Sequence, residues 1–315
     1  MARLRIIFMG TAELSCVSLQ RLLESPQVEV VAVVAQPDRP KGRQLKVQPP
    51  PAKTLALRAQ VPVLQPGRAR DPEFLEQVQA LSPDIIAVAA YGQILPPALL
   101  NLPRWGCVNV HTSLLPRYRG AAPIQWALLN GDFETGVTIM KMDVGLDTGD
   151  ILAQAKTPID PEDDGQRLHD RLASLGADLL VQTIPEYVEG RLQPRPQPTE
   201  GVTYARKITR EDGHLDWTLP AGVLWNRVRG LVPWPGAYTF LPGPPQQRML
   251  KIWQAEVTEA GGPAGEVLRA DNQGVVVGCG EGALKVLALQ LEGGRRLTAR
   301  QFLAGHPLLP GLKLG

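Results

Sequence analysis

The clearest strand signal in the chain is Asp84-Ile85-Ile86-Ala87-Val88-Ala89-Ala90, a short run that is apolar after Asp84 and ends at Tyr91-Gly92. An apolar run of this length, bounded by turn residues, is typical of a strand that is buried on both faces. The alternation of such runs with helical patterns predicts an α/β domain with a Rossmann-like, mostly parallel sheet. Further strands are expected at 4–9, 28–35, 108–111 and 136–140, and helices at about 13–25, 71–80 and 123–130.

A second, smaller domain is expected after a proline-rich linker. The run from Gly190 to Pro198 contains three prolines, which favour an extended backbone and exclude a helix. Short apolar runs separated by Gly, Asn and Asp turns then follow, and they predict a small OB-like β-barrel. The 315-residue chain is thus divided into an α/β domain at 1–189, a linker at 190–208 and a barrel at 209–315.

Composition excludes several classes of protein. The net charge of +2 does not by itself indicate nucleic-acid binding, so any RNA contact has to come from local basic patches. The three cysteines are widely spaced, which favours reduced thiols over disulfides or a zinc site. No apolar stretch approaches the roughly 18 residues of a membrane span, so we expect a cytoplasmic chain without a membrane segment.

Nucleotide motifs are absent from the places where this fold would carry them. The first strand is followed by Gly10-Thr11-Ala12-Glu13, which lacks the G-x-G-x-x-G pattern of dinucleotide-binding proteins, and the chain has no P-loop. We therefore expect neither NAD nor ATP as a cofactor.

Asn109, His111 and Asp147 are the candidate catalytic residues. An amide can hold a developing oxyanion, while an imidazole and a carboxylate can move protons, and acyl transfer to an amine needs these functions. Asn109 and His111 fall at the carboxyl end of a predicted strand, where ligands bind in sheets of this kind. From the residues alone, a structural histidine remains the alternative interpretation.

Asp143, Asp147 and Asp150 form an acidic segment that Gly145 and Gly149 interrupt, which predicts a loop. The spacing of a calcium-binding EF-hand is absent, and no bidentate Glu follows at the required place. We therefore expect no metal ion at this loop.

The motifs around these residues resemble those of the formyltetrahydrofolate-dependent transformylases. The matching segments are Asn109-x-His111-x-Ser113-Leu114-Leu115-Pro116, Arg119-Gly120-Ala121-Ala122-Pro123-Ile124-Gln125 and Asp143-x-Gly145-Leu146-Asp147-Thr148-Gly149-Asp150. The similarity runs nearly from end to end. It implies that 10-formyltetrahydrofolate is the co-substrate, without a metal ion, and that Asn109, His111 and Asp147 are catalytic. It also implies that the folate lies against Ser113, Leu114, Leu115 and Pro116 on one side and Ala90, Tyr91 and Gly92 on the other.

The member of the family that the chain resembles most formylates the α-amine of methionyl initiator tRNA. The resemblance assigns tRNA binding to a basic loop at 38–47, with Arg43 at the matching position. A second candidate surface includes Lys207 in the linker, and an OB-like C-terminal barrel is a common platform for nucleic acids. A solvated charge run is the alternative for the loop. We expect a monomer. The candidate tRNA-binding residues are Arg39, Lys41, Arg43, Lys46 and Lys207.

Three rival functions remain open at the level of the sequence. A related enzyme could formylate an aminosugar nucleotide, a hydrolase could pass the formyl group to water, and an RNA-binding protein could have kept the fold without catalysis. The segment Gly10-Thr11-Ala12-Glu13-Leu14 also departs from the family pattern Gly-Thr-Pro-x-Phe, which puts the rigidity of that turn in doubt.

Overall fold

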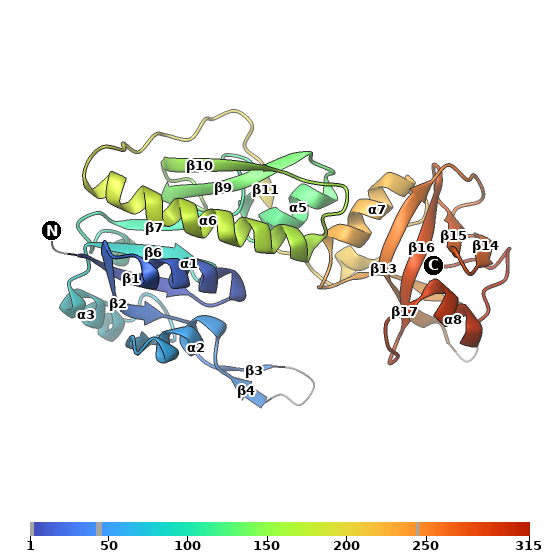
Figure 1. Cartoon of the computed structure of the whole chain (residues 1–315), viewed down its shortest axis with the longest axis horizontal. Helices are drawn as coiled ribbons and strands as arrows, with labels where there is room; N and C mark the ends of the chain where they lie inside the picture. Colours follow the sequence, from blue (N-terminus) through green and yellow to red (C-terminus); the bar gives the residue numbers. More distant parts are fainter. Residues whose placement is uncertain (1–2, 42–45, 244–245) are drawn as a thin grey trace. The chain divides into compact units, whose positions relative to one another are not determined.

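The computed structural model describes residues 3–41, 46–243 and 246–315 (Figure 1). The chain forms two compact units, which we treat separately. The first unit comprises residues 1–123, 134–158 and 169–205, and the second comprises 124–133, 159–168 and 206–315. No helix in the described part of the chain is both long enough and apolar enough to cross a membrane.

The first unit is built on a sheet whose strands, within the described residues, follow the order β10-β9-β7-β6-β1-β2-β5. The five strands from β7 to β5 run parallel, whereas β9 is antiparallel to β7 and β10 is antiparallel to β9. The sheet is therefore mostly parallel, as predicted, with an antiparallel edge. The strands are β1 (Leu4–Gly10), β2 (Val28–Val34), β5 (Val63–Leu64), β6 (Ile85–Ala89), β7 (Cys107–His111), β9 (Glu134–Lys141) and β10 (Ile151–Pro158).

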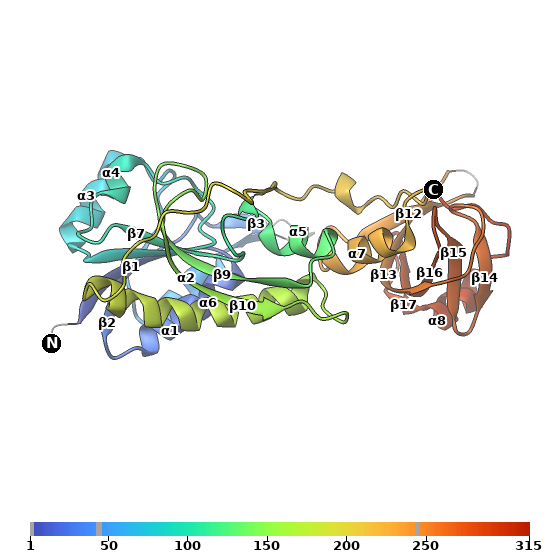
Figure 2. The same ribbon diagram turned by 90° about the horizontal axis from the view of Figure 1, so that it is seen from above.

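Helices cover both faces of this sheet, and Figure 2 shows α1 and α6 on one face with α3 and α4 on the other. Gly176 of α6 packs against Val110 and Val137, which therefore point toward α6. Successive side chains of a strand point to opposite faces, so Asn109 and His111 point away from α6. The helices of this unit are α1 (Glu13–Glu24), α2 (Pro51–Arg58), α3 (Pro72–Leu81), α4 (Pro97–Leu100) and most of α6 (Gly165–Val188). Helix α5 (Pro123–Leu129) belongs to the second unit apart from its first residue.

The strands and helices predicted between residues 4 and 140 are confirmed, and several elements were not predicted. The strand expected at 136–140 is β9, and the helices expected at 71–80 and 123–130 are α3 and α5. Among the elements missing from the prediction are the strands β5 and β10, the helices α2, α4 and α6, and the hairpin of β3 (Arg39–Lys41) and β4 (Lys46–Gln48).

The proline-rich linker is not detached from the first unit. Arg195 exchanges two backbone hydrogen bonds with Ile151 of β10, at 2.7 and 2.9 Å. Further along, β11 (Tyr204–Ala205) pairs in parallel with β8 (Arg119–Gly120). The linker therefore follows the sheet, and one of its residues reaches the site described below.

The second unit contains an antiparallel sheet that follows the order β12-β13-β16-β15-β14 among the described residues, with β17 paired to β16. The chain end lies between the two edges, because Gly315 donates a backbone hydrogen bond to Phe240 of β12 and Leu314 donates one to Gly265 beside β14. This arrangement is compatible with the OB-like barrel, which stays a prediction. The elements are η1 (Glu211–Gly213), α7 (Ala221–Gly230), β12 (Ala237–Leu241), β13 (Arg248–Thr258), β14 (Val267–Asp271), β15 (Gly274–Gly278), β16 (Ala283–Leu291), β17 (Leu297–Thr298) and α8 (Ala299–Gly305).

Candidate active site

The carboxyl end of β7 carries Asn109 and His111 on one face of the sheet. The register pairs Asn109 with Val88 of β6 on one side and with Met140 of β9 on the other. Among the described residues, none forms a hydrogen bond with the Asn109 amide, so this group is available to a substrate. His111 is buried, at 5% exposure.

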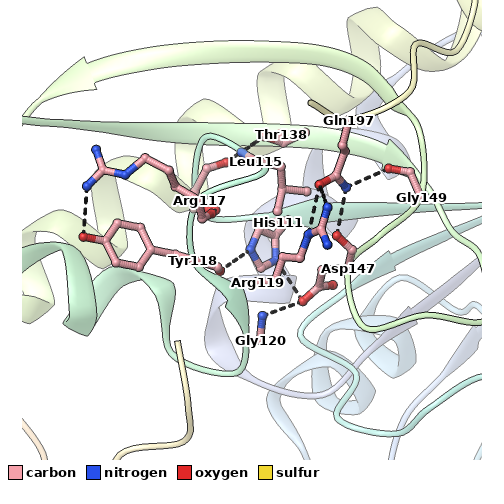
Figure 3. A network of polar contacts seen from close by, with 11 residues as sticks. His111, Leu115, Arg117, Tyr118, Arg119, Gly120, Thr138, Asp147, Gly149 and Gln197 are labelled. Carbon is pink, nitrogen blue, oxygen red and sulfur yellow. Dashed lines mark hydrogen bonds and ion pairs between the residues drawn. The ribbon is translucent and has the colours of Figure 1, made fainter. Parts of the chain in front are cut away.

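The His111 ring is oriented by a backbone carbonyl. Its Nε2 atom lies 2.9 Å from the carbonyl oxygen of Tyr118, which can only accept, so Nε2 carries a proton (Figure 3). The other ring nitrogen, Nδ1, lies 3.7 Å from Oδ2 of Asp147. Since Nε2 is committed to the carbonyl, His111 can exchange a proton with its surroundings only through Nδ1.

Asp147 comes from the loop at 142–150 that joins β9 to β10. Strand β9 ends at Lys141, opposite Val108, so the loop has to fold back over the sheet before Asp147 can reach His111. The backbone of Asp147 has a φ of +52°, a left-handed conformation that costs a non-glycine residue roughly 1–2 kcal/mol. The backbone N–H of Gly120 donates to Oδ2 of Asp147 at 2.8 Å.

Glycine is required at two positions beside the aspartate. A Cβ atom at Gly149 would overlap the carbonyl oxygen of Lys141, so the loop can return to β10 only without a side chain there. Gly120 has a φ of +117°, and a Cβ atom at this position would lie 2.7 Å from the carbonyl oxygen of Ala205. These two glycines allow the close backbone approach that brings the Asp147 carboxylate to His111.

The aspartates of the loop have different surroundings. Asp143 accepts hydrogen bonds from the backbone N–H of Gly145 and from the Thr148 hydroxyl, at 3.0 and 2.7 Å. Asp143 therefore stabilises the conformation of the loop, while the Asp147 carboxylate points to the His111 imidazole. Across the described residues, His, Cys, Asp and Glu side chains form no group of three or more that could hold a metal ion.

Gln197 joins this site from the linker, and the sequence interpretation missed it. Its Nε2 atom donates to the carbonyl oxygens of Asp147 and Gly149, each at 2.8 Å, and its Oε1 accepts from Arg119 (Figure 3). The composition of the linker carries no signal for this role. Only the position of Gln197 between Pro196 and Pro198, which restrict its backbone, hinted at a defined conformation.

The loop at 113–116, expected to contact folate, is held by the neighbouring strands. The Ser113 hydroxyl donates to the carbonyl of Arg117 at 2.6 Å, and the Thr138 hydroxyl of β9 donates to the carbonyl of Ser113 at 2.7 Å. Leu115 is buried, while the side chains of Leu114 and Pro116 are partly exposed. Of the four predicted residues, Leu114 and Pro116 therefore have the side chains best placed to contact a ligand.

The three residues of the strand exit at Ala90-Tyr91-Gly92 differ in exposure. The Tyr91 ring is 2% exposed and packs in the core with residues of α3, and burial raises the pKa of its hydroxyl to about 12. The Tyr91 ring therefore faces the core, and the predicted contact of this residue with folate stays a prediction. Ala90 and Gly92 are exposed, so their backbone is accessible to a ligand on this side of the site.

The turn after β1 is stabilised without the proline of the family pattern. The Thr11 hydroxyl donates to the carbonyl of Tyr91 at 2.9 Å and accepts from the backbone N–H of Gln36 at 3.3 Å. The Gln36 side chain donates to the same carbonyl at 2.9 Å. Hydrogen bonds between the ends of β1, β2 and β6 thus replace the rigidity that the missing proline would supply.

Comparison with known proteins agrees with this arrangement. Residues 4–184 match the model of the family described as formyl transferase, and residues 207–307 match the model of the formyl transferase C-terminal domain. The chain belongs to the formyl transferase family.

Similar proteins extend the comparison over the whole chain. The methionyl-tRNA formyltransferase of Geobacter sulfurreducens is 50% identical over 315 residues, which cover 100% of this chain and 98% of the relative. That of Caldanaerobacter subterraneus is 51% identical over 311 residues, covering 98% and 99%. An N-formyltransferase from Helicobacter canadensis, solved with folinic acid and dTDP-3-aminofucose, superimposes with a TM-score of 0.67 at 18% identity, covering 93% of this chain and 100% of that one. At that identity, the structure supports the fold alone.

The basic loop of this formyl transferase is a hairpin in its described part. Strand β3 pairs antiparallel with β4, and both Arg39 and Lys46 are exposed. Lys41 ends β3, and Arg43 lies outside the described residues.

The base of the hairpin is anchored to the first unit by a small polar cluster. The Lys53 ammonium of α2 lies 2.9 Å from both carboxylate oxygens of Asp38 and 2.6 Å from Oε1 of Gln65. The Gln65 amide also donates to Asp38, and these hydrogen bonds hold the pKa of Asp38 below its usual value. The cluster fixes the chain immediately before Arg39.

Lys207 is exposed in the second unit, whereas the neighbouring Arg206 is occupied. The Arg206 guanidinium donates to both carboxylate oxygens of Asp212 and lies 5.1 Å from the centre of the Trp126 ring. The two adjacent cations therefore differ in role. Arg206 stabilises the unit, whereas the exposed Lys207 side chain forms no ion pair with a described residue.

Proposed function

We propose that this chain transfers the formyl group of 10-formyltetrahydrofolate to the α-amine of methionyl initiator tRNA. The proposal is supported by relatives named methionyl-tRNA formyltransferase, which are about 50% identical over nearly the whole chain. The observation in the structure that carries it is the position of Asp147 beside His111, near the Asn109 side chain at the end of β7, whose amide has no hydrogen-bond partner within the described part of the chain.

The reaction forms one carbon–nitrogen bond, breaks another and moves one proton. The amine nitrogen forms a bond to the formyl carbon, the bond from that carbon to N10 of the folate breaks, and a proton passes from the amine to N10. We propose that the side-chain amide of Asn109 donates a hydrogen bond to the formyl oxygen, which gains negative charge as the amine attacks. Protonated at Nδ1, His111 adds positive charge near the same oxygen.

Asp147 takes the proton from the attacking amine and helps return a proton to the folate nitrogen. The carboxylate suits this role because it is partly exposed, is held by the Gly120 N–H and faces the nitrogen of His111 that can exchange a proton. The folate supplies the activated formyl group. The proposed contacts for the folate are the loop Ser113, Leu114, Leu115 and Pro116 on one side and the strand exit Ala90, Tyr91 and Gly92 on the other.

We propose that the tRNA, which accepts the formyl group, binds to surfaces that carry exposed cations. The hairpin at 39–48 supplies Arg39 and Lys46, and we extend the proposal to Lys41, Arg43 and Lys207. Exposed cations attract RNA phosphates, and the resulting affinity falls as salt rises. We also propose that residues 1–189 are the catalytic domain, that residues 209–315 bind tRNA, and that the chain works as a cytoplasmic monomer.

The deciding experiment is formyl transfer from 10-formyltetrahydrofolate to methionyl initiator tRNA, with free methionine, uncharged tRNA and a dTDP-aminosugar as alternative acceptors. Transfer to the charged tRNA alone is the expected result. Transfer to the aminosugar instead would replace the acceptor while keeping the catalytic residues. Release of formate without any acceptor would identify a hydrolase.

A further inference from the structure

We infer that Gln197, a linker residue, is a positioning residue that holds the Asp147 loop in its working conformation. The inference rests on the proposed catalytic role of Asp147. Gln197 touches no reacting atom in this scheme, since its contacts are the backbone of the loop and the Arg119 side chain.

The hydrogen bonds of Gln197 use every polar group of its side chain. Two N–H groups donate to the carbonyl oxygens of Asp147 and Gly149, and the side-chain oxygen accepts from Nε and Nη2 of Arg119 at 3.1 and 2.7 Å. An arginine can only donate and a backbone carbonyl can only accept, so the orientation of the amide is determined by its partners. Glutamate can replace the acceptor but cannot supply the two donors.

These hydrogen bonds are made to a residue with an unfavourable backbone conformation. Asp147 has a left-handed backbone that a non-glycine residue adopts only when its surroundings hold it there. One Gln197 bond is made to the carbonyl of this residue and the other to a carbonyl two residues later. Together they bracket the turn that directs the Asp147 carboxylate to His111.

Arg119 connects Gln197 to the strand residue that binds the Asp147 carboxylate. Arg119 immediately precedes Gly120, whose N–H donates to Oδ2 of Asp147. Gln197 thus links the backbone behind Asp147 to the strand that contacts its carboxylate, in a closed ring of hydrogen bonds (Figure 3).

The linker is suited to present this side chain. Pro196 and Pro198 restrict the backbone on either side of Gln197, and Arg195 is tied to Ile151 at the edge of the sheet. A side chain on a restricted backbone loses less conformational entropy when it is ordered. The proline-rich segment therefore serves as a support for the active-site loop in addition to joining the two units.

The test compares Gln197→Glu and Gln197→Met with Gln193→Glu, a matched control in the same linker. Gln193 is exposed, and among the described residues its side chain donates only to the carbonyl of Gly190. Gln197→Glu keeps an acceptor for Arg119 and loses both donors, while Gln197→Met loses all four hydrogen bonds at similar volume. A displaced catalytic group costs on the order of 10- to 100-fold in kcat, so we expect that loss in both variants.

Two further readouts separate positioning from general stability. The KM values for folate and for charged tRNA should stay within about 3-fold, because Gln197 contacts neither substrate in the proposed scheme. Amide hydrogen exchange should accelerate at 144–149 in both Gln197 variants and stay unchanged in Gln193→Glu. A kcat within 2-fold of the parent in both Gln197 variants would overturn the inference, as would unchanged exchange in this loop.

Asp147→Asn, measured in parallel, distinguishes this failure from failure of the proposed function. An inactive Asp147→Asn together with fully active Gln197 variants would overturn the positioning role alone. A fully active Asp147→Asn would overturn the catalytic role of Asp147 and, with it, the need to position that residue.

Discussion

Nε2 of His111 donates a hydrogen bond to the carbonyl oxygen of Tyr118 at 2.9 Å, and this single contact decides how the ring can act. It commits one ring nitrogen to the backbone and leaves Nδ1 facing Asp147 Oδ2 at 3.7 Å. The two side chains therefore form one proton-handling unit in which His111 has a fixed tautomer and Asp147 faces the nitrogen that exchanges its proton.

Replacing Asp147 by Asn should remove turnover while preserving the fold. The amide keeps the size of the side chain and can still accept from the Gly120 N–H, but it cannot take a proton from the substrate amine. We expect kcat to fall by about 100-fold or more. The measurement is single-turnover formyl transfer to charged tRNA beside the melting temperature. Asp143→Asn, which alters a neighbouring carboxylate of the same loop, is the control, and a near-normal rate in Asp147→Asn would remove this residue from its role.

Asn109→Ala should reduce kcat more than it raises KM. The Asn109 amide is proposed to donate to the formyl oxygen only as charge develops, and the loss of one such donor costs about 10²- to 10³-fold in kcat. Folding should be unaffected, because the amide has no hydrogen-bond partner among the described residues. Asn109→Asp tests the sign of the interaction, since a carboxylate would repel the developing charge. Equal kcat values for the parent protein and both variants would show that Asn109 does not stabilise the oxyanion.

Much of the fold could be predicted because strand signals are local. The run at Ile85–Ala89 is apolar at every position, and in the structure every one of these residues is buried. Helix α6 was missed although it is the longest helix among the described residues, because Gly176 and Pro185 weaken its helical pattern. Gly176 is needed there because a larger residue would collide with Val110 and Val137.

The site could be predicted only in part, because its geometry depends on contacts between residues far apart in the sequence. Asn109 and His111 are placed by the strand on which they lie, so their shared face follows from strand periodicity. The different surroundings of Asp143 and Asp147 could not be predicted from spacing, since both lie beside glycines in one loop. Gln197 lies 50 residues from Asp147 and 78 from Arg119, and no local pattern indicates that these three residues meet.

The basic hairpin should contribute to tRNA use through its exposed cations. We expect Arg39→Gln and Lys46→Gln each to raise the KM for charged tRNA and to flatten its dependence on salt, with a change in log–log slope of about 0.7–0.9 per lost phosphate contact. Arg43→Ala, at a position outside the described residues, should act in the same direction. Turnover at saturating tRNA should be retained.

The matched control for the hairpin is Arg58→Gln, which removes an exposed cation from helix α2 without altering the hairpin. It should leave both the KM and the salt slope near their original values. Identical slopes for the hairpin variants and this control would assign the hairpin charges to ordinary solvation.

Asp212 should make the stability of the second unit dependent on acid pH. Hydrogen bonds from Arg206 lower the pKa of Asp212 to about 2, whereas an unfolded aspartate titrates near roughly 3.9. Because the folded pKa is the lower one, the stabilisation is complete above about pH 4 and is lost as the pH falls toward 2. Allowing for solvent screening at the Arg206 end, which is more than half exposed, we expect Asp212→Asn to lower the free energy of unfolding by about 1–2 kcal/mol at pH 7.

The measurement is urea unfolding of the full chain, followed by tryptophan fluorescence from pH 7 downward. The difference between the parent and Asp212→Asn should shrink as the pH approaches 2, because the parent carboxyl is then protonated and has lost its ion pair. Glu256→Gln is the control in the same unit, since Glu256 forms a more exposed pair with Lys285 at 3.4 Å and should change stability by less than about 0.5 kcal/mol. A difference between Asp212→Asn and the parent that stayed constant with pH would show that Asp212 acts through packing and not through its charge.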